Sequence, residues 1–145
     1  FQTSSIGSLK LKTLQDLYSC FTNDPAADVL KQISILFPTE EHVEDSHLGV
    51  ANASSIIMAA KFWDDVLPKD AFADKKQPEG AGLKPTPLKM IVSTSGQDGV
   101  TAEDSCVYLG SHNMSQAAWG SFEKNKTQIC IYNCELGVVF GPGQS

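Results

Sequence analysis

The chain has 145 residues, a formal net charge of −6 and 11 basic residues, every one of which is lysine. This length is typical of a single domain that buries roughly two thirds of the surface of its unfolded chain. Without arginine there is no planar fork for guanine edges, and an acidic chain neutralises few phosphates, so a sequence-reading repressor and a nucleic-acid coat are both disfavoured. A site that handles a single phosphate still needs only one local lysine. No apolar run approaches the roughly 20 residues that cross a membrane, so no membrane partner is expected.

Short strands and helices alternate in the first part of the chain. Residues 1–9 carry the β-branched and small polar side chains of a strand edge that ends in a loop. A helix that ends at Asn23-Asp24-Pro25 is predicted from apolar residues at helical spacing, namely Leu14, Leu17, Tyr18 and Phe21. Asp24 is then expected to cap a second helix with Pro25 at its first position. Residues 33–37 are predicted to form a core strand.

The middle of the chain is less regular. Residues 39–47 are acidic and predict a solvent-facing helix. A strand at residues 54–58 and a short amphipathic stretch at residues 59–67 follow. Residues 69–87 lose periodicity and gather proline, glycine and lysine, which predicts a flexible loop within the domain. Residues 89–93 then resume as a strand.

The stretch VYLGSHNMSQAAWG, residues 107–120, predicts a buried strand, a tight turn and a helix. The helix pattern carries Trp119 and Phe122, and Asn113 with Gln116 has the spacing of a capping box. Free N–H groups at such a strand-to-helix break favour an anion, because the unpaired donors and the helix dipole point the same way. The same unit is also common as plain architecture, so the pattern alone leaves both interpretations open.

Two β runs, residues 128–132 and 136–140, close the chain. Strands interleaved with helices predict one α/β domain over residues 1–145, layered in the α+β manner, with a mixed β-sheet flanked by helices. No CxxC pair occurs, which predicts the reduced, buried thiols of an intracellular protein at Cys20, Cys106, Cys130 and Cys134. His42 and His47 lie beside the acidic stretch without metal-ligand spacing, so neither a metal nor a cofactor is expected.

The segment from Val107 to Phe140 closely resembles the C-terminal signature of the tyrosyl-DNA phosphodiesterases, a family of the phospholipase D superfamily. In that family an Asn precedes Ser-x-Ala-Ala-Trp-Gly, and Glu-Lys-Asn, a strand and Glu-Leu-Gly follow. The matching residues here are Asn113, Ser115, Ala117 to Gly120, Glu123 to Asn125 and Glu135 to Gly137. The opening FQTSSIGSL is similar to another family segment, whose serines lie along the bound DNA strand.

The resemblance implies hydrolysis of a phosphodiester at a DNA 3′ end, single-stranded or nicked, which releases a tyrosine or peptide adduct. In the family, two His-x-Lys motifs converge from two like halves, each an α-β-α sandwich, so this chain is expected to be one half of a pseudo-dimer whose N-terminal half is missing. One histidine forms a phosphohistidine, and the other protonates the leaving phenol and then activates water. Lysines and asparagines hold the phosphoryl oxygens, no metal is needed, and DNA repair implies a nuclear location.

By position, Lys89 corresponds to the motif lysine, Asn113 to its companion, and Glu135 to the acidic group that orients a histidine. The DNA-binding residues implied by the resemblance are Ser4, Ser5, Ser8 and Ser115. Each has a simpler interpretation. Lys89 is then a solvated strand-end lysine, Asn113 a helix cap and Glu135 a surface carboxylate that pairs with a lysine, whereas the serines only form turns.

The chain departs from the family just before Lys89, where Pro87-Leu88-Lys89 replaces Pro-His-x-Lys. One residue missing between Pro87 and Leu88 is the simplest account. His112 is not expected to replace it at the Asn113 site, because neighbours in extended backbone face opposite sides. We therefore expect the isolated chain to be inactive. The alternative is a non-catalytic, phospholipase D-like binding or structural module, and a phospholipid-cleaving enzyme comes third.

Overall fold

The computed structural model describes residues 1–8, 10–22, 28–46, 49–63, 69–73, 88–94 and 105–141. The predicted cap at Asp24 and Pro25, as well as His47 and Pro87, lie outside the described residues. None of the helices in these ranges is long and apolar enough to cross a membrane.

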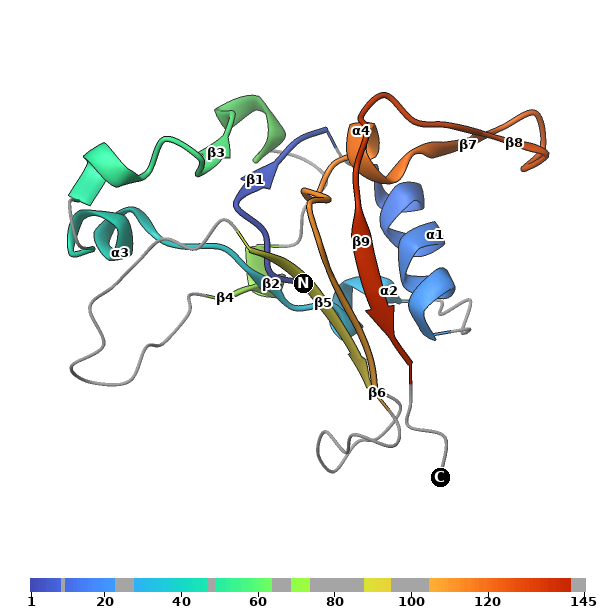
Figure 1. Ribbon diagram of the computed structural model, residues 1–145, viewed down its shortest axis with the longest axis horizontal. Coiled ribbons are helices and arrows are strands. Elements are labelled where there is room, and N and C mark those ends of the chain that lie inside the picture. The colour runs from blue at the N-terminus through green and yellow to red at the C-terminus, as the bar shows by residue number, and fades with distance from the viewer. Residues whose placement is uncertain are drawn as a thin grey trace.

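The central strand is β6 (Ser105–Gly110), which pairs antiparallel with β5 (Lys89–Thr94) on one side and β9 (Gly137–Phe140) on the other. Gln2 joins this sheet, because its N–H donates to Met90 O at 2.7 Å and Met90 N–H donates back at 3.0 Å. The same N-terminal segment bonds to β2 (Ile35–Leu36), which runs parallel to β4 (Phe72–Ala73). Parallel and antiparallel pairs therefore occur together, and the sheet is mixed as predicted (Figure 1).

The strands of the first half are shorter than predicted. In the runs predicted at residues 33–37 and 54–58, only two residues each form a strand, β2 and β3 (Ile57–Met58). Strand β3 pairs parallel with β1 (Ser5–Ile6). The loop prediction for residues 69–87 is wrong at its start, where η3 (Lys69–Ala71) leads into β4. Ala71 is buried in the core, and this burial fixes a segment whose composition is typical of a loop. The remainder of that stretch, residues 74–87, lies outside the described residues.

Helix α1 (Leu11–Thr22) contains the four apolar residues that predicted it and ends just before Asn23, as predicted. The second helix, α2 (Val29–Gln32), is shorter and starts later than predicted, after Asp28. Helix α3 (Glu40–Glu44) is the expected acidic helix, and its N-cap Thr39 accepts the His42 N–H at 3.2 Å. The 3₁₀ turns η1 (Gly49–Asn52) and η2 (Ala60–Phe62) follow, the second within the predicted amphipathic stretch.

Residues from both ends of the chain form the hydrophobic core, whose buried members are Ile6, Leu14, Val29, Ile35, Ala71 and Met114. Each large side chain among them contributes about 1.5–3 kcal/mol relative to exposure. The cysteines are all free thiols, but Cys20 and Cys134 are exposed, so the expectation of buried thiols fails for these two. Cys134 lies next to the exposed segment that leads into β9.

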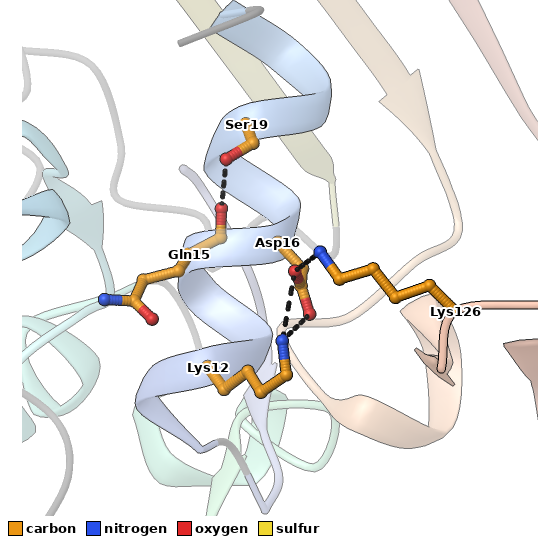
Figure 2. A network of polar contacts seen from close by, with 5 residues as sticks. All are labelled: Lys12, Gln15, Asp16, Ser19 and Lys126. Carbon is orange, nitrogen blue, oxygen red and sulfur yellow. Dashed lines mark hydrogen bonds and ion pairs between the residues drawn. The ribbon is translucent and has the colours of Figure 1, made fainter. Parts of the chain in front are cut away.

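Strands β7 (Ser121–Glu123) and β8 (Gln128–Cys130) form a hairpin that projects from the body of the protein (Figure 1). Asp16 of α1 forms an ion pair with Lys126 in the turn of this hairpin, with Lys126 Nζ 3.1 Å from Asp16 Oδ1 (Figure 2). Asp16 also pairs with Lys12 of its own helix, whose Nζ lies 3.2 Å from Oδ2. Burial raises the pKa of the Asp16 carboxyl, but the hydrogen bonds and charges of the two lysines outweigh it and hold that pKa below its ordinary value.

Candidate active site at the end of strand β6

Three segments converge at the C-terminal end of β6. Lys89, the first residue of β5, lies directly opposite Gly110, and Gly110 in turn lies opposite Gly137 of β9. The antiparallel register thus brings Lys89, the residues after Gly110 and the residues before Gly137 to the same edge of the sheet. Two of the three predicted catalytic residues, Lys89 and Glu135, are brought together there.

Glu135 is held by several groups. Ser111 Oγ donates to Glu135 Oε2 in a short contact, and Asn133 Nδ2 donates to Oε1 at 3.0 Å. Ser111 is itself fixed, because its Oγ accepts the Leu136 N–H at 2.9 Å. Burial raises the pKa of Glu135, but the two hydrogen bonds and the positive charges of His112 and Lys89 outweigh it, so the pKa lies below its usual value. The carboxylate is therefore ionised at neutral pH.

Lys89 is half-buried and forms no hydrogen bond or close ion pair within the described residues. Its positive charge contributes to the lowered pKa of Glu135, with which it shares this edge of the sheet. An ammonium group without a close partner can bind a phosphoryl oxygen without first breaking a salt bridge. This is the role that the position of Lys89 implies.

Asn113 does not cap the helix, so the predicted capping box is wrong. The N-cap of α4 (Gln116–Trp119) is Ser115, whose Oγ accepts the Ala118 N–H at 3.2 Å. The helix ends at Trp119, because Gly120 leaves helical geometry with φ of +84°, and the predicted helical residue Phe122 lies in β7. The competition between Asn113 and Ser115 for the cap is decided by tertiary contacts.

These contacts join Asn113 to the N-terminal segment. Its Oδ1 accepts from Ser4 Oγ at 3.3 Å and from Thr3 Oγ1 at 3.5 Å. The backbone of β1 runs beside it, since Met114 N–H donates to Ser5 O at 3.2 Å. Within the described part of the chain, Asn113 forms no hydrogen bond with Lys89 or Glu135.

The serines predicted to bind DNA lie in the two segments that these contacts join, residues 4–8 and 113–116. Ser4 is 2% exposed and donates to Asn113, whereas Ser5 is half-buried in β1. Ser8 is exposed, and its carbonyl accepts the Gln116 N–H at 3.1 Å. Ser115 is half-buried and occupied as the helix cap. The four serines are therefore grouped around Asn113, with only the Ser8 side chain on the open surface.

Sequence reasoning missed the aromatic layer beside the site. The Tyr108 hydroxyl makes a short contact with His112 Nδ1, and the His112 ring packs on Trp119 with centroids 4.3 Å apart. Phe21 of α1 packs edge-on against both Tyr108 and Trp119. The signal that could have revealed this layer is the pair of glycines, Gly110 and Gly137, that leave space on neighbouring strands.

An apolar pocket of about 740 Å³ lies elsewhere, between α3, η1 and β3, and its walls include Val43, Val50, Met58, Trp63 and Phe72. It contains no residue of the predicted site. Across the ranges that the structure describes, no group of three or more His, Cys, Asp or Glu side chains could hold a metal ion.

Comparison with known proteins identifies the family of the chain. The sequence model of the family described as "Tyrosyl-DNA phosphodiesterase" matches residues 1–145. The chain is 32% identical over 147 aligned residues to "Tyrosyl-DNA phosphodiesterase 1" of Arabidopsis thaliana, an alignment that covers 98% of this chain and 24% of the relative. The chain thus spans about a quarter of the length of that relative. It belongs to the tyrosyl-DNA phosphodiesterase family.

Proposed function

We propose that this chain is the C-terminal part of a DNA-repair phosphodiesterase that hydrolyses 3′-phosphotyrosyl and related adducts at DNA 3′ ends in the nucleus. Family membership supports the reaction class, and one structural observation carries the assignment of the site. Lys89, without a close partner among the described residues, shares the end of β6 with the ionised Glu135. A cation for the phosphoryl oxygens and a carboxylate for a proton-transferring group are what such a hydrolysis needs.

The proposed division of labour follows from these positions. Lys89 stabilises the charge that builds on the phosphoryl oxygens, and Glu135 stabilises a positively charged histidine nearby. Asn113 holds the N-terminal segment that carries the serines, because its Oδ1 accepts hydrogen bonds from Thr3 and Ser4. A phosphohistidine forms on a histidine of the other half, which lies outside this chain, so the chain alone is inactive.

Exposed apolar side chains support the need for that other half. β9 forms one edge of the sheet in the described part of the chain, and Val138, Val139 and Phe140 are all more than half exposed. Leu136, just before it, is 82% exposed. Soluble proteins rarely leave such a cluster in water, and an edge strand of this kind favours association. A second half that covers β9 would bury these apolar side chains and prevent unspecific association at this edge.

One observation favours a second candidate. The sequence Pro87-Leu88-Lys89 lacks the histidine that the family motif requires. A non-catalytic module that retains the fold and binds DNA ends would keep Lys89 and Asn113 and would have no use for the acid.

The test compares the isolated chain with the full-length protein that carries it, on a 3′-phosphotyrosyl oligonucleotide. We expect no turnover by the isolated chain and hydrolysis by the full-length protein. Lys89→Met should lower the rate by about 10²–10³-fold, the usual cost of one group that stabilises a developing charge. Lys61→Met, on exposed η2, is the matched control and should retain the rate. Tight binding without any hydrolysis by the full-length protein would instead establish the non-catalytic module.

A further inference from the structure

Tyr108 occupies a space that only glycine leaves open. A Cβ atom added at Gly137 would lie 2.1 Å from Tyr108 Cε2, and one at Gly110 would lie 1.9 Å from the Tyr108 hydroxyl oxygen. The phenol ring therefore lies across β6 and β9 above these two glycines. In this position its hydroxyl reaches His112 Nδ1 beyond the end of β6.

His112 is held by two aromatic residues in this arrangement. Tyr108 binds Nδ1, the Trp119 ring packs against the imidazole at an interplanar angle of 31°, and Tyr108 also contacts it edge-on. Nε2 has no hydrogen-bond partner within the described residues and is not among the buried unpaired atoms. The atom left available to a ligand is therefore Nε2.

The ring lies on the face of the sheet that carries Lys89. Residues directly opposite in an antiparallel pair share a face, and so do residues two apart along a strand. Tyr108 lies opposite Ile91, which is two residues from Lys89. Ser93 confirms which face this is, because its Oγ donates to Phe21 O of α1 at 3.2 Å, and Phe21 packs on Tyr108. His112 diverges from Asn113 as expected, yet this divergence directs it to the Lys89 face.

We propose that His112 is a proton-transfer residue of the Lys89–Glu135 site and that Tyr108 is its positioning residue. The proposal rests on the proposed phosphodiesterase function and names a further residue of the same site. It assigns to His112 a proton-transfer role that the sequence before Lys89 no longer supplies.

The proton balance is simple. First, a nitrogen of the histidine of the other half bonds to phosphorus while the bond from phosphorus to the phenol oxygen breaks, and the phenolate takes a proton from solvent. Water then bonds to phosphorus while the bond from phosphorus to that histidine breaks. His112 Nε2 accepts the proton that the attacking water loses and then releases it to solvent, so the imidazole ends neutral. Glu135 stabilises the imidazolium in between.

The charged neighbours of the ring suit this role. Burial lowers the pKa of His112, and the negative charge of Glu135 opposes that shift without cancelling it, so the ring is a neutral base at pH 7. Burial also raises the pKa of Tyr108, which keeps the phenol protonated. Lys89 also lies on this face, and its ammonium interacts with Glu135.

The experiment measures steady-state hydrolysis of a 3′-phosphotyrosyl oligonucleotide by the full-length protein from pH 5 to 9. The wild-type rate should rise with pH through the depressed pKa of His112. His112→Gln should lose that rise and about 10²–10⁴-fold in kcat, with little change in KM. Imidazole should restore part of the rate to His112→Ala. Tyr108→Phe should lower kcat and alter the acid limb, and His42→Gln, in α3 and outside the site, should do neither.

The outcomes separate the two proposals. A wild-type protein that does not hydrolyse the substrate would overturn the proposed function and this inference with it. An active wild type whose pH profile and kcat are unchanged in His112→Gln would overturn only the role of His112. If His112→Gln does not fold, as seen by circular dichroism, the Tyr108→Phe profile decides: a profile identical to wild type contradicts the proposal.

Discussion

Replacing Gly137 with alanine tests whether the phenol of Tyr108 packs against the backbone of β9. The new Cβ would lie 2.1 Å from Tyr108 Cε2, 2.4 Å from Cζ and 2.3 Å from the hydroxyl oxygen, whereas ordinary contact lies between 3.4 and 4 Å. The ring would have to move by more than 1 Å. It cannot easily do so, because Tyr108 is only 4% exposed and Phe21 and Trp119 pack against it.

Overpacking of this kind costs about 1–3 kcal/mol. Backbone strain adds nothing, because Gly137 is not among the residues with positive φ. A loss of about 2 kcal/mol in a domain of this size corresponds to a fall in Tm of roughly 4–8 °C. Urea denaturation gives the free energy of unfolding, and near-ultraviolet circular dichroism reports the displaced aromatic ring.

Gly141→Ala is the matched control, because a Cβ there meets nothing within 4 Å, and its stability should stay within about 0.5 kcal/mol of wild type. In a Tyr108→Ala background the clash is gone, so Gly137→Ala should then cost no more than the control. Equal costs of Gly137→Ala in the two backgrounds would refute the packing of Tyr108 over Gly137, and with it the positioning of His112.

Two further predictions concern the helices. Ser115→Ala should lower the free energy of unfolding by about 0.5–2 kcal/mol, because it removes the cap that accepts the Ala118 N–H, and a variant as stable as wild type in urea would contradict this. Asp16→Asn should lower stability by about 0.2–1 kcal/mol at pH 7, where the carboxylate pairs with two lysines. Because the folded pKa of Asp16 is depressed, its contribution is complete above the ordinary value of 3.8 and is lost as the pH falls through the folded value. The two proteins should therefore become equally stable in strongly acidic urea titrations, and a difference that persists there would rule out the ion pairs as its cause.

Much of the architecture follows from local patterns in the sequence. Helical spacing is sufficient for α1, and continuous apolar runs are sufficient for β5 and β6, because period and side-chain type determine these elements before any tertiary contact forms. The residues of Glu135-Leu136-Gly137 and of the stretch from Asn113 to Gly120 were sufficient to indicate the family. Strand β4 was beyond prediction, and β2 is shorter than the run predicted at residues 33–37, since two-residue strands exist only through pairing with a distant segment.

The site shows the same division between sequence and tertiary structure. The sequence determined which residue types are present: Lys89, Asn113 and Glu135 stand out because they match the positions of the family's motifs. Only the tertiary structure decided their contacts, because strand register brings Lys89 and Glu135 to one end of β6 while the N-terminal segment competes for the Asn113 side chain and leaves the helix cap to Ser115. The surroundings of His112 are decided in the same way. Its ring contacts Tyr108, four residues earlier in the chain, and Trp119 of α4. The position of the Tyr108 ring depends on Gly110 and Gly137, which are far apart in sequence and become neighbours only through the pairing of β6 with β9.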